Sequence, residues 1–94
     1  MLNISRKILE VLPMREKIEK ILNEIIPGVD LSCGTLIESG YIDSLALINL
    51  ISELDIEFDI EITFSELNVD NFSSVESIQA LVEQKVQAGG SSKE

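Results

Sequence analysis

Histidine is absent from this 94-residue sequence, and cysteine occurs once, as Cys33. Without histidine the chain lacks the commonest general base and the commonest zinc ligand, so most hydrolase and transferase mechanisms lose their usual proton carrier. A single cysteine excludes an intrachain disulfide, and Cys33 has no His or Cys companion at metal-ligand spacing. The sequence therefore argues against an enzyme and predicts neither a catalytic residue nor a metal site.

Positive charge is also scarce, because 17 acidic residues face 7 basic ones and give a formal charge of -10. Such a surface repels the phosphates of nucleic acids and of anionic lipids, and it favours partners with basic docking patches. Acidity that only keeps a small protein in solution would explain the same charge. We expect no nucleic-acid partner.

No apolar run is long enough to span a membrane, and Arg6 and Lys7 interrupt the first apolar stretch before a signal-like core can form. We therefore expect a cytoplasmic protein without membrane insertion. The length fits one small domain with a modest core. We divide the chain into an N-terminal extension at 1–13, a domain at 14–87 and a disordered tail at 88–94.

The spacing of apolar residues predicts an all-α bundle of three main helices, at about 14–26, 43–58 and 74–86. Pro13 suits the start of the first helix, and Pro27-Gly28 stops it. Asp43 is a good N-cap for the second helix. The predicted buried faces are Met14, Ile18, Ile21, Leu22 and Ile25; Leu47, Leu50, Ile51, Leu54 and Phe58; and Val75, Ile78, Leu81, Val82 and Val86.

Two connections join these helices. The first is a long loop at about 28–41, in which we expect Leu36 and Ile37 to enter the core. In the second connection apolar and polar residues alternate, but three such positions without a partner strand cannot form a sheet. We expect an extended segment there and a short helical turn at about 65–67. Ser73 and Glu76 then form a predicted capping box for the last helix.

The second helix has an unusual outer face, opposite its predicted core stripe. At 100° per residue this outer strip consists of Leu45, Ile48, Asn49, Ser52 and Ile56. An amphipathic helix does not expose three large apolar side chains without reason. Acidic residues flank the strip, namely Glu53, Asp55, Glu57 and Asp59. We interpret it as a docking face for an apolar groove with a basic rim. The alternative is a helix buried on two sides and covered by another segment, such as the N-terminal extension.

Ser44 stands in the first turn of this helix, beside the outer strip. A hydroxyl near the positive end of the helix dipole is well placed to receive a phosphoryl group. Position alone favours the simpler role of a serine that helps to cap the helix. No His or Lys lies nearby in the sequence to activate Ser44 as a nucleophile.

The run Gly40-Tyr41-Ile42-Asp43-Ser44-Leu45 resembles the attachment motif of acyl and peptidyl carrier proteins, whose core is Asp-Ser-Leu. The preceding Leu36-Ile37-Glu38-Ser39-Gly40 is similar to the loop by which that family approaches the motif. The helix ends in Glu57-Phe58, as the second helix of the family does. A Ser-Val-Glu-Ser-Ile start to the last helix completes the likeness, which covers about 14–85.

The resemblance implies an acyl-carrier-like four-helix bundle, with three main helices and a short third helix. It implies that a phosphopantetheinyl transferase attaches 4'-phosphopantetheine from coenzyme A to Ser44. The thiol of that arm would hold an acyl or aminoacyl group as a thioester. Asp43 matches the family's acidic residue before the serine, and Leu45, Ile48 and Ser52 match its partner-recognition helix. A carrier has no catalytic residues of its own, which agrees with the absence of histidine.

The pathway stays open between fatty-acid, polyketide, nonribosomal-peptide and D-alanyl transfer. The stretch from Ser65-Glu66-Leu67 to Phe72 resembles D-alanyl carrier proteins. Asn49 and Ser52 stand where fatty-acid carriers more often place an acidic and an apolar residue, which argues against that pathway. Expected partners are acyl or aminoacyl ligases or synthases with basic docking patches, and we expect a monomer.

Two other functions are compatible with the residues. An unmodified acidic helical protein-interaction module would use the same outer strip, so Ile48 would be essential and Ser44 dispensable. A small regulatory protein would instead be phosphorylated at Ser44 by an ATP-dependent kinase. The complete loop, motif and helix context around Ser44 makes the carrier the preferred interpretation.

Overall fold

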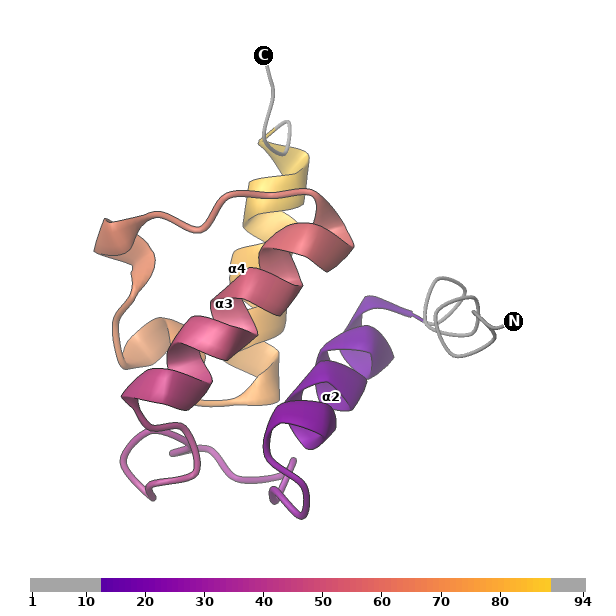
Figure 1. Cartoon of the computed structure of the whole chain (residues 1–94). Coiled ribbons are helices and arrows are strands. Elements are labelled where there is room, and N and C mark those ends of the chain that lie inside the picture. The colour runs from indigo at the N-terminus through magenta and orange to yellow at the C-terminus, as the bar shows by residue number, and fades with distance from the viewer. Residues whose placement is uncertain (1–12, 89–94) are drawn as a thin grey trace.

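The computed structural model describes residues 13–88, which form an all-α fold without strands in that range. Three α-helices pack together in Figure 1, and two single 3-10 turns lie in the connection between the second and third of them. Their bounds are α2 Met14–Ile25, α3 Ser44–Phe58, η1 Phe64–Glu66, η2 Asp70–Phe72 and α4 Val75–Gln87. The predicted helical bundle is therefore confirmed. The predicted extension and tail, apart from Pro13 and Ala88, lie outside the described residues.

Helix α2 begins directly after Pro13, which is its N-cap and accepts the amide of Lys17 at 3.0 Å. The helix ends at Ile25, one residue before the predicted end, as is common at helix boundaries. Gly28 then adopts φ +85°, a backbone conformation that L side chains rarely adopt. The Pro27-Gly28 pair therefore turns the chain away from the helix axis and into the long loop.

The start of α4 corrects one prediction. Ser74 is the N-cap, and its hydroxyl accepts the Ser77 amide at 3.0 Å while the Ser77 hydroxyl accepts the Ser74 amide at 3.0 Å. The predicted capping box of Ser73 and Glu76 was wrong by one residue. The N-cap position needs extended backbone, which Ser74 has at φ -153° and ψ 167°, whereas Ser73 is already helical at φ -79° and ψ -25°. Glu76 binds Arg15 on α2 instead, at 2.8 Å.

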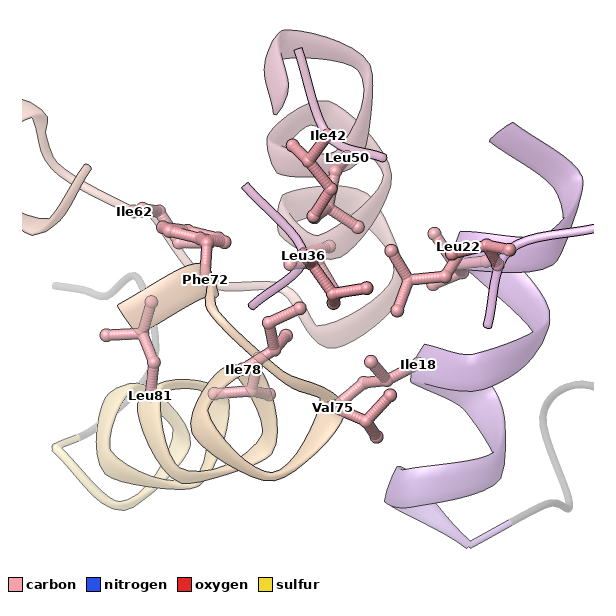
Figure 2. Close-up of a cluster of buried hydrophobic side chains, with 14 of the residues drawn as sticks. Ile18, Leu22, Leu36, Ile42, Leu50, Ile62, Phe72, Val75, Ile78 and Leu81 are labelled. Atoms are coloured by element: carbon pink, nitrogen blue, oxygen red, sulfur yellow. The ribbon is translucent and has the colours of Figure 1, made fainter. Parts of the chain in front are cut away.

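The core lies where the three helices and the long loop meet. Helix α2 packs against both α3 and α4, and α3 packs against α4. Figure 2 shows Leu36, from the long loop, among side chains of all three helices. The fully enclosed large side chains are Ile18, Leu22, Leu36, Leu50, Leu54, Phe72, Val75, Ile78 and Val82. The prediction that Leu36 enters the core is confirmed, whereas Val86, predicted to be buried, is 42% exposed.

The connection from α3 to α4 lies on the opposite side of α3 from α2 (Figures 1 and 2). Ile60 and Ile62 are buried, and the Ile62 amide donates to Asp55 Oδ1 on α3 at 3.1 Å. The predicted short turn is η1, one residue earlier than expected. The second turn, η2, was not predicted, and its Phe72 is fully buried in the core.

Candidate functional site

Ser44 is the first residue of α3, and its side chain is exposed. Within residues 13–88 its hydroxyl makes no hydrogen bond, and the amides of Ser44 and Leu45 have no acceptor. The first amides of a helix point out of its end and carry partial positive charge, so they attract anions. The site therefore offers an accessible hydroxyl beside two amides that can face a phosphate.

The approach to Ser44 is fixed by two buried residues of the loop. The Leu36 amide donates to the Ser73 carbonyl at 2.8 Å, which ties the loop to the start of α4. The Ile42 amide donates to the Leu36 carbonyl at 3.1 Å, and both side chains are buried. Gly40, at φ +88°, makes the tight turn between them possible. Ser44 thus lies two residues from a core anchor, in a defined position on the surface.

Asp43 is the N-cap of α3, as the sequence predicted. Its Oδ1 accepts the Ala46 amide at 2.8 Å, and its backbone carbonyl accepts the Leu47 amide at 2.8 Å. Both bonds satisfy amides that would otherwise lack partners at the helix start. Asp43 therefore sets where α3 begins, and this decides that Ser44 is its first residue.

The outer strip is exposed along the whole of α3. Leu45 is 68%, Ile48 61% and Ile56 65% exposed, and Asn49 and Ser52 between them are also exposed. No segment within residues 13–88 covers these side chains, which excludes burial on two sides by the described part of the fold. Their exposure is confirmed, and their use by a partner stays a prediction.

The carboxylates of α3 are less available than the sequence suggested. Glu53 is exposed, but Asp55 binds the Ile62 amide, and burial raises the pKa of Asp55. Glu57 has a side chain only 8% exposed and pairs with Lys17 of α2 at 3.7 Å. Part of the predicted acidic rim thus serves to join elements of the fold. The amphipathic pattern of α3 could not indicate this, because both partners lie outside the helix.

Two features of the surface were missed by the sequence analysis. Phe64 is 90% exposed on η1. In the long loop, Cys33, Thr35 and Ser39 form a polar cluster, with the two hydroxyls 2.8 Å apart. Hydrogen bonds from Thr35 and then Ser39 lower the pKa of the Cys33 thiol. The spacing of three polar residues within one loop was the available signal for this cluster. The alternating pattern groups Phe64 with Ile60 and Ile62, which are buried, so it gave no signal for the exposure of Phe64.

The remaining features of residues 13–88 do not compete with Ser44 as a site. An open hollow of about 340 Å³ lies between η2 and α4, and none of its lining residues comes from α3 or from the loop before it. In this range no three His, Cys, Asp or Glu side chains are grouped to hold a metal ion. None of the helices described is both long and apolar enough to cross a bilayer.

Comparison with known proteins finds two relatives, both of which are named D-alanyl carrier protein. The chain is 36% identical over 73 residues to a D-alanyl carrier protein of Leuconostoc mesenteroides subsp. mesenteroides. It is 34% identical over 73 residues to a D-alanyl carrier protein of Leuconostoc citreum. Each match covers 74% of this chain and 92% of the relative. No family model and no solved structure matches the chain. At this identity and coverage, the chain belongs to the acyl carrier family, with the D-alanyl carrier proteins as its relatives, and it is a carrier rather than an enzyme.

Proposed function

We propose that Ser44 bears a covalent 4'-phosphopantetheine arm and that the chain carries D-alanine between partner enzymes. The observation that supports this most directly is the exposed Ser44 hydroxyl at the capped start of α3, inside an Asp-Ser-Leu motif. The names of the two relatives support D-alanine as the cargo. When bound, the arm supplies a thiol that can hold the cargo as a thioester.

The residues around Ser44 fit such a group. The Ser44 side chain is exposed to solvent, so an attached phosphodiester would meet no steric conflict with the described residues. The amides of Ser44 and Leu45 and the positive end of the α3 dipole favour the negative charge that a phosphodiester brings. Asp43 already caps the Ala46 amide, so its carboxylate is held back against the helix end. Leu45 presents an apolar side chain beside the attachment point.

In the attachment step, Ser44 Oγ forms a bond to the pantetheine-bearing phosphorus of coenzyme A. The P–O bond that joins this phosphorus to the adenosine side of the diphosphate breaks, and adenosine 3',5'-bisphosphate leaves. The serine proton passes to a base that the phosphopantetheinyl transferase must supply, because this chain has no histidine. The role of Ser44 is thus to be accessible and fixed in position. The proposal includes a cytoplasmic location, because the attachment step consumes coenzyme A from the cytoplasm.

Partner recognition falls to the outer strip in this proposal. Leu45, Ile48 and Ile56 offer apolar contact, and Asn49 and Ser52 offer polar contact between them. The proposed partners are the phosphopantetheinyl transferase and an ATP-dependent ligase that adenylates D-alanine. The transferase acts on the Ser44 hydroxyl and the ligase on the thiol of the attached arm, and tethering raises the effective concentration of that thiol at the ligase active site. The net charge of -10 favours partners whose docking patches are basic.

Intact mass spectrometry tests the attachment. The purified chain is incubated with coenzyme A and a broad-specificity phosphopantetheinyl transferase, beside Ser44→Ala and the control Ser32→Ala. Ser32 is an exposed serine of the long loop, outside both the motif and the outer strip, so its removal matches the loss of a hydroxyl without touching either. We expect the wild type and Ser32→Ala to gain the mass of phosphopantetheine and Ser44→Ala to stay unmodified. A folded wild type that gains no mass would contradict the proposal.

The same assay separates the competing functions. A mass gain that depends on ATP and a kinase, and equals one phosphate, would support the regulatory protein instead. An unmodified wild type that still binds a basic partner through Ile48 would support the interaction module. If the arm attaches, adding ATP and a D-alanine-adenylating ligase identifies the cargo, because D-alanine should add its residue mass to the modified chain. Loading with a fatty acid and not with D-alanine would assign another pathway.

A further inference from the structure

Phe64 is held outside the fold, unlike the other two phenylalanines. Of the three phenylalanines, Phe72 is fully buried and Phe58 is partly buried against the core, whereas Phe64 is 90% exposed. Leaving a phenylalanine in water forgoes one of the largest hydrophobic gains available to a small domain. Aromatic side chains, phenylalanine among them, are enriched at protein–protein interfaces relative to the rest of the surface.

The turn that carries Phe64 is well fixed, so the exposure is built into the fold. Thr63 and Glu66 form a capping box around it, with the Thr63 amide 2.8 Å from Glu66 Oε1. Lys85 of α4 pairs with the same carboxylate at 3.0 Å, and the side chain of Asn71 donates to the Glu66 carbonyl at 2.9 Å. These bonds hold η1 to α4 and to the start of η2. Phe64 is thus presented on a fixed turn, which limits the entropy lost on binding.

The turn lies beside the C-terminal half of α3. Two residues before Phe64, buried Ile62 donates its amide to Asp55 of α3 at 3.1 Å. Asp55 follows Ser44 by eleven residues, or about 16 Å of helix. Its neighbour Ile56 is the last member of the outer strip and is 65% exposed. The turn that carries Phe64 is therefore joined to α3 about three helical turns from Ser44, at a point remote from the attachment site.

The surroundings of Phe64 define the charge of its partner. The segment 61–70 contains three acidic residues and no basic one, and its exposed carboxylates are those of Glu61 and Asp70. The nearby cation Lys85 is already paired with Glu66. Val69, also exposed, adds apolar surface to the same segment. An aromatic side chain amid carboxylates complements an apolar pocket edged by Lys or Arg, and it repels anionic lipid and a second copy of this acidic chain.

We propose that Phe64 is the anchor of a second docking site. Its side chain inserts into an apolar pocket, edged by basic residues, on the ligase that loads the arm. The choice of the ligase rests on the proposed function. A transferase must bring its catalytic groups to the Ser44 hydroxyl itself. A ligase acts at the far end of the arm, so it can hold the carrier at a point remote from Ser44, and Phe64 is such a point.

Isothermal titration calorimetry with a purified D-alanine-adenylating ligase tests this proposal on the chain without its arm. We compare wild type, Phe64→Ala and Glu61→Lys with the control Val86→Ala, which removes exposed apolar surface from α4. We expect Phe64→Ala to raise Kd by about tenfold or more, the effect of losing an anchor residue. Glu61→Lys should raise Kd less, and Val86→Ala should leave it within about twofold.

Each outcome bears on the proposal separately from the attachment at Ser44. An unchanged Kd for Phe64→Ala, or no measurable binding of folded wild type, would overturn it even if the arm attaches. A chain that is never modified but loses binding on Phe64→Ala would keep the docking site and remove the arm. If sedimentation shows dimers that Phe64→Ala abolishes, or if anionic phosphatidylglycerol vesicles bind through Phe64, the occupant is not the ligase and the proposal fails. Should Phe64→Ala not fold, Glu61→Lys decides the matter.

Discussion

Asp43 and Ser44 are neighbours in the motif, but the side chain of Asp43 is hydrogen-bonded within the fold and that of Ser44 is not. The Asp43 side chain is committed to the Ala46 amide at 2.8 Å, whereas the Ser44 hydroxyl makes no bond within the described residues. A residue that caps a helix fixes where the helix starts, and the next residue inherits a defined position. The motif therefore combines a structural residue with a chemically available one, and substitution should separate the two roles.

Substitution of Asp43 should be felt as a loss of stability. Asp43→Ala leaves the Ala46 amide without its acceptor, and we expect the free energy of unfolding to fall by about 0.5–2 kcal/mol. Asp43→Asn keeps a side-chain oxygen at the same place, so it should lose much less. Urea denaturation followed by circular dichroism measures both variants. Equal losses for Asn and Ala would contradict a capping role and would indicate that the charge of Asp43 matters instead.

Helix α3 has one face that packs against the core and another that is exposed to solvent. Helix α3 buries Leu50 and Leu54 and exposes the outer strip. Its Asp55 and Glu57 bind the segment before η1 and helix α2, respectively. The short turn η1 depends in the same way on Glu66, which links it to Lys85 of α4. The turn that carries Phe64 is thus attached to α4 through an ionised carboxylate, so the strength of this attachment depends on pH.

Glu66 should contribute stability that is lost in acid. Burial alone would raise its pKa, but the hydrogen bonds from Thr63 and Lys85 outweigh burial and hold the pKa of Glu66 below its ordinary value. A carboxyl whose pKa is lowered by folding stabilises the protein above its unfolded pKa and loses this effect as pH falls through its folded pKa. We therefore expect the urea midpoint of wild type to fall more steeply than that of Glu66→Gln between neutral pH and about pH 3.

Other carboxyls provide an internal comparison for that titration. Glu76, whose pKa is lowered mainly by its hydrogen bond to Arg15, is present in both proteins and cancels in the difference. Asp55 acts in the opposite direction, because a pKa raised by burial gives stability at low pH that is lost as pH rises. Parallel pH profiles for wild type and Glu66→Gln would show that Glu66 does not hold η1 in solution.

The whole molecule is a small bundle whose hydrophobic core includes one residue from a loop and one from a 3-10 turn, besides those of the three α-helices. Leu36 and Phe72 are both fully buried and lie outside the three α-helices. Figure 2 shows that they fill the space between α3 and α4. With so few buried side chains, each one accounts for a large share of a folding free energy of about 5–15 kcal/mol, the range of small domains.

A pair of substitutions measures how much one buried side chain contributes to the free energy of unfolding. Phe72→Ala should lower the free energy of unfolding by about 3–5 kcal/mol, because it removes a fully buried ring and leaves a cavity. Phe64→Ala removes the same atoms from a 90% exposed position and should change stability by less than about 0.5 kcal/mol. Urea denaturation of both variants gives the contrast. A large loss for Phe64→Ala would mean that Phe64 is buried in solution.

Much of the site could be predicted because its determinants are local. The period of the apolar residues places α2, α3 and α4, and Asp43 fixes the start of α3 through its own side chain. The outer strip followed from the same period, since residues opposite a buried stripe face outward unless another segment covers them. Leu36 was predicted to enter the core because a long loop in a compact domain needs an anchor.

The sequence by itself thus determined the helices, the cap and the exposed face of α3, which depend on neighbours within a few turns. Only the tertiary structure decided that Phe72 is inside and Phe64 outside, and that Glu57 turns toward Lys17. The path of the chain after α3 is set by contacts across the fold, such as those of Ile62 with Asp55 and of Leu36 with Ser73. Short segments without a helical period have no local preference strong enough to choose a direction, so packing chooses it for them.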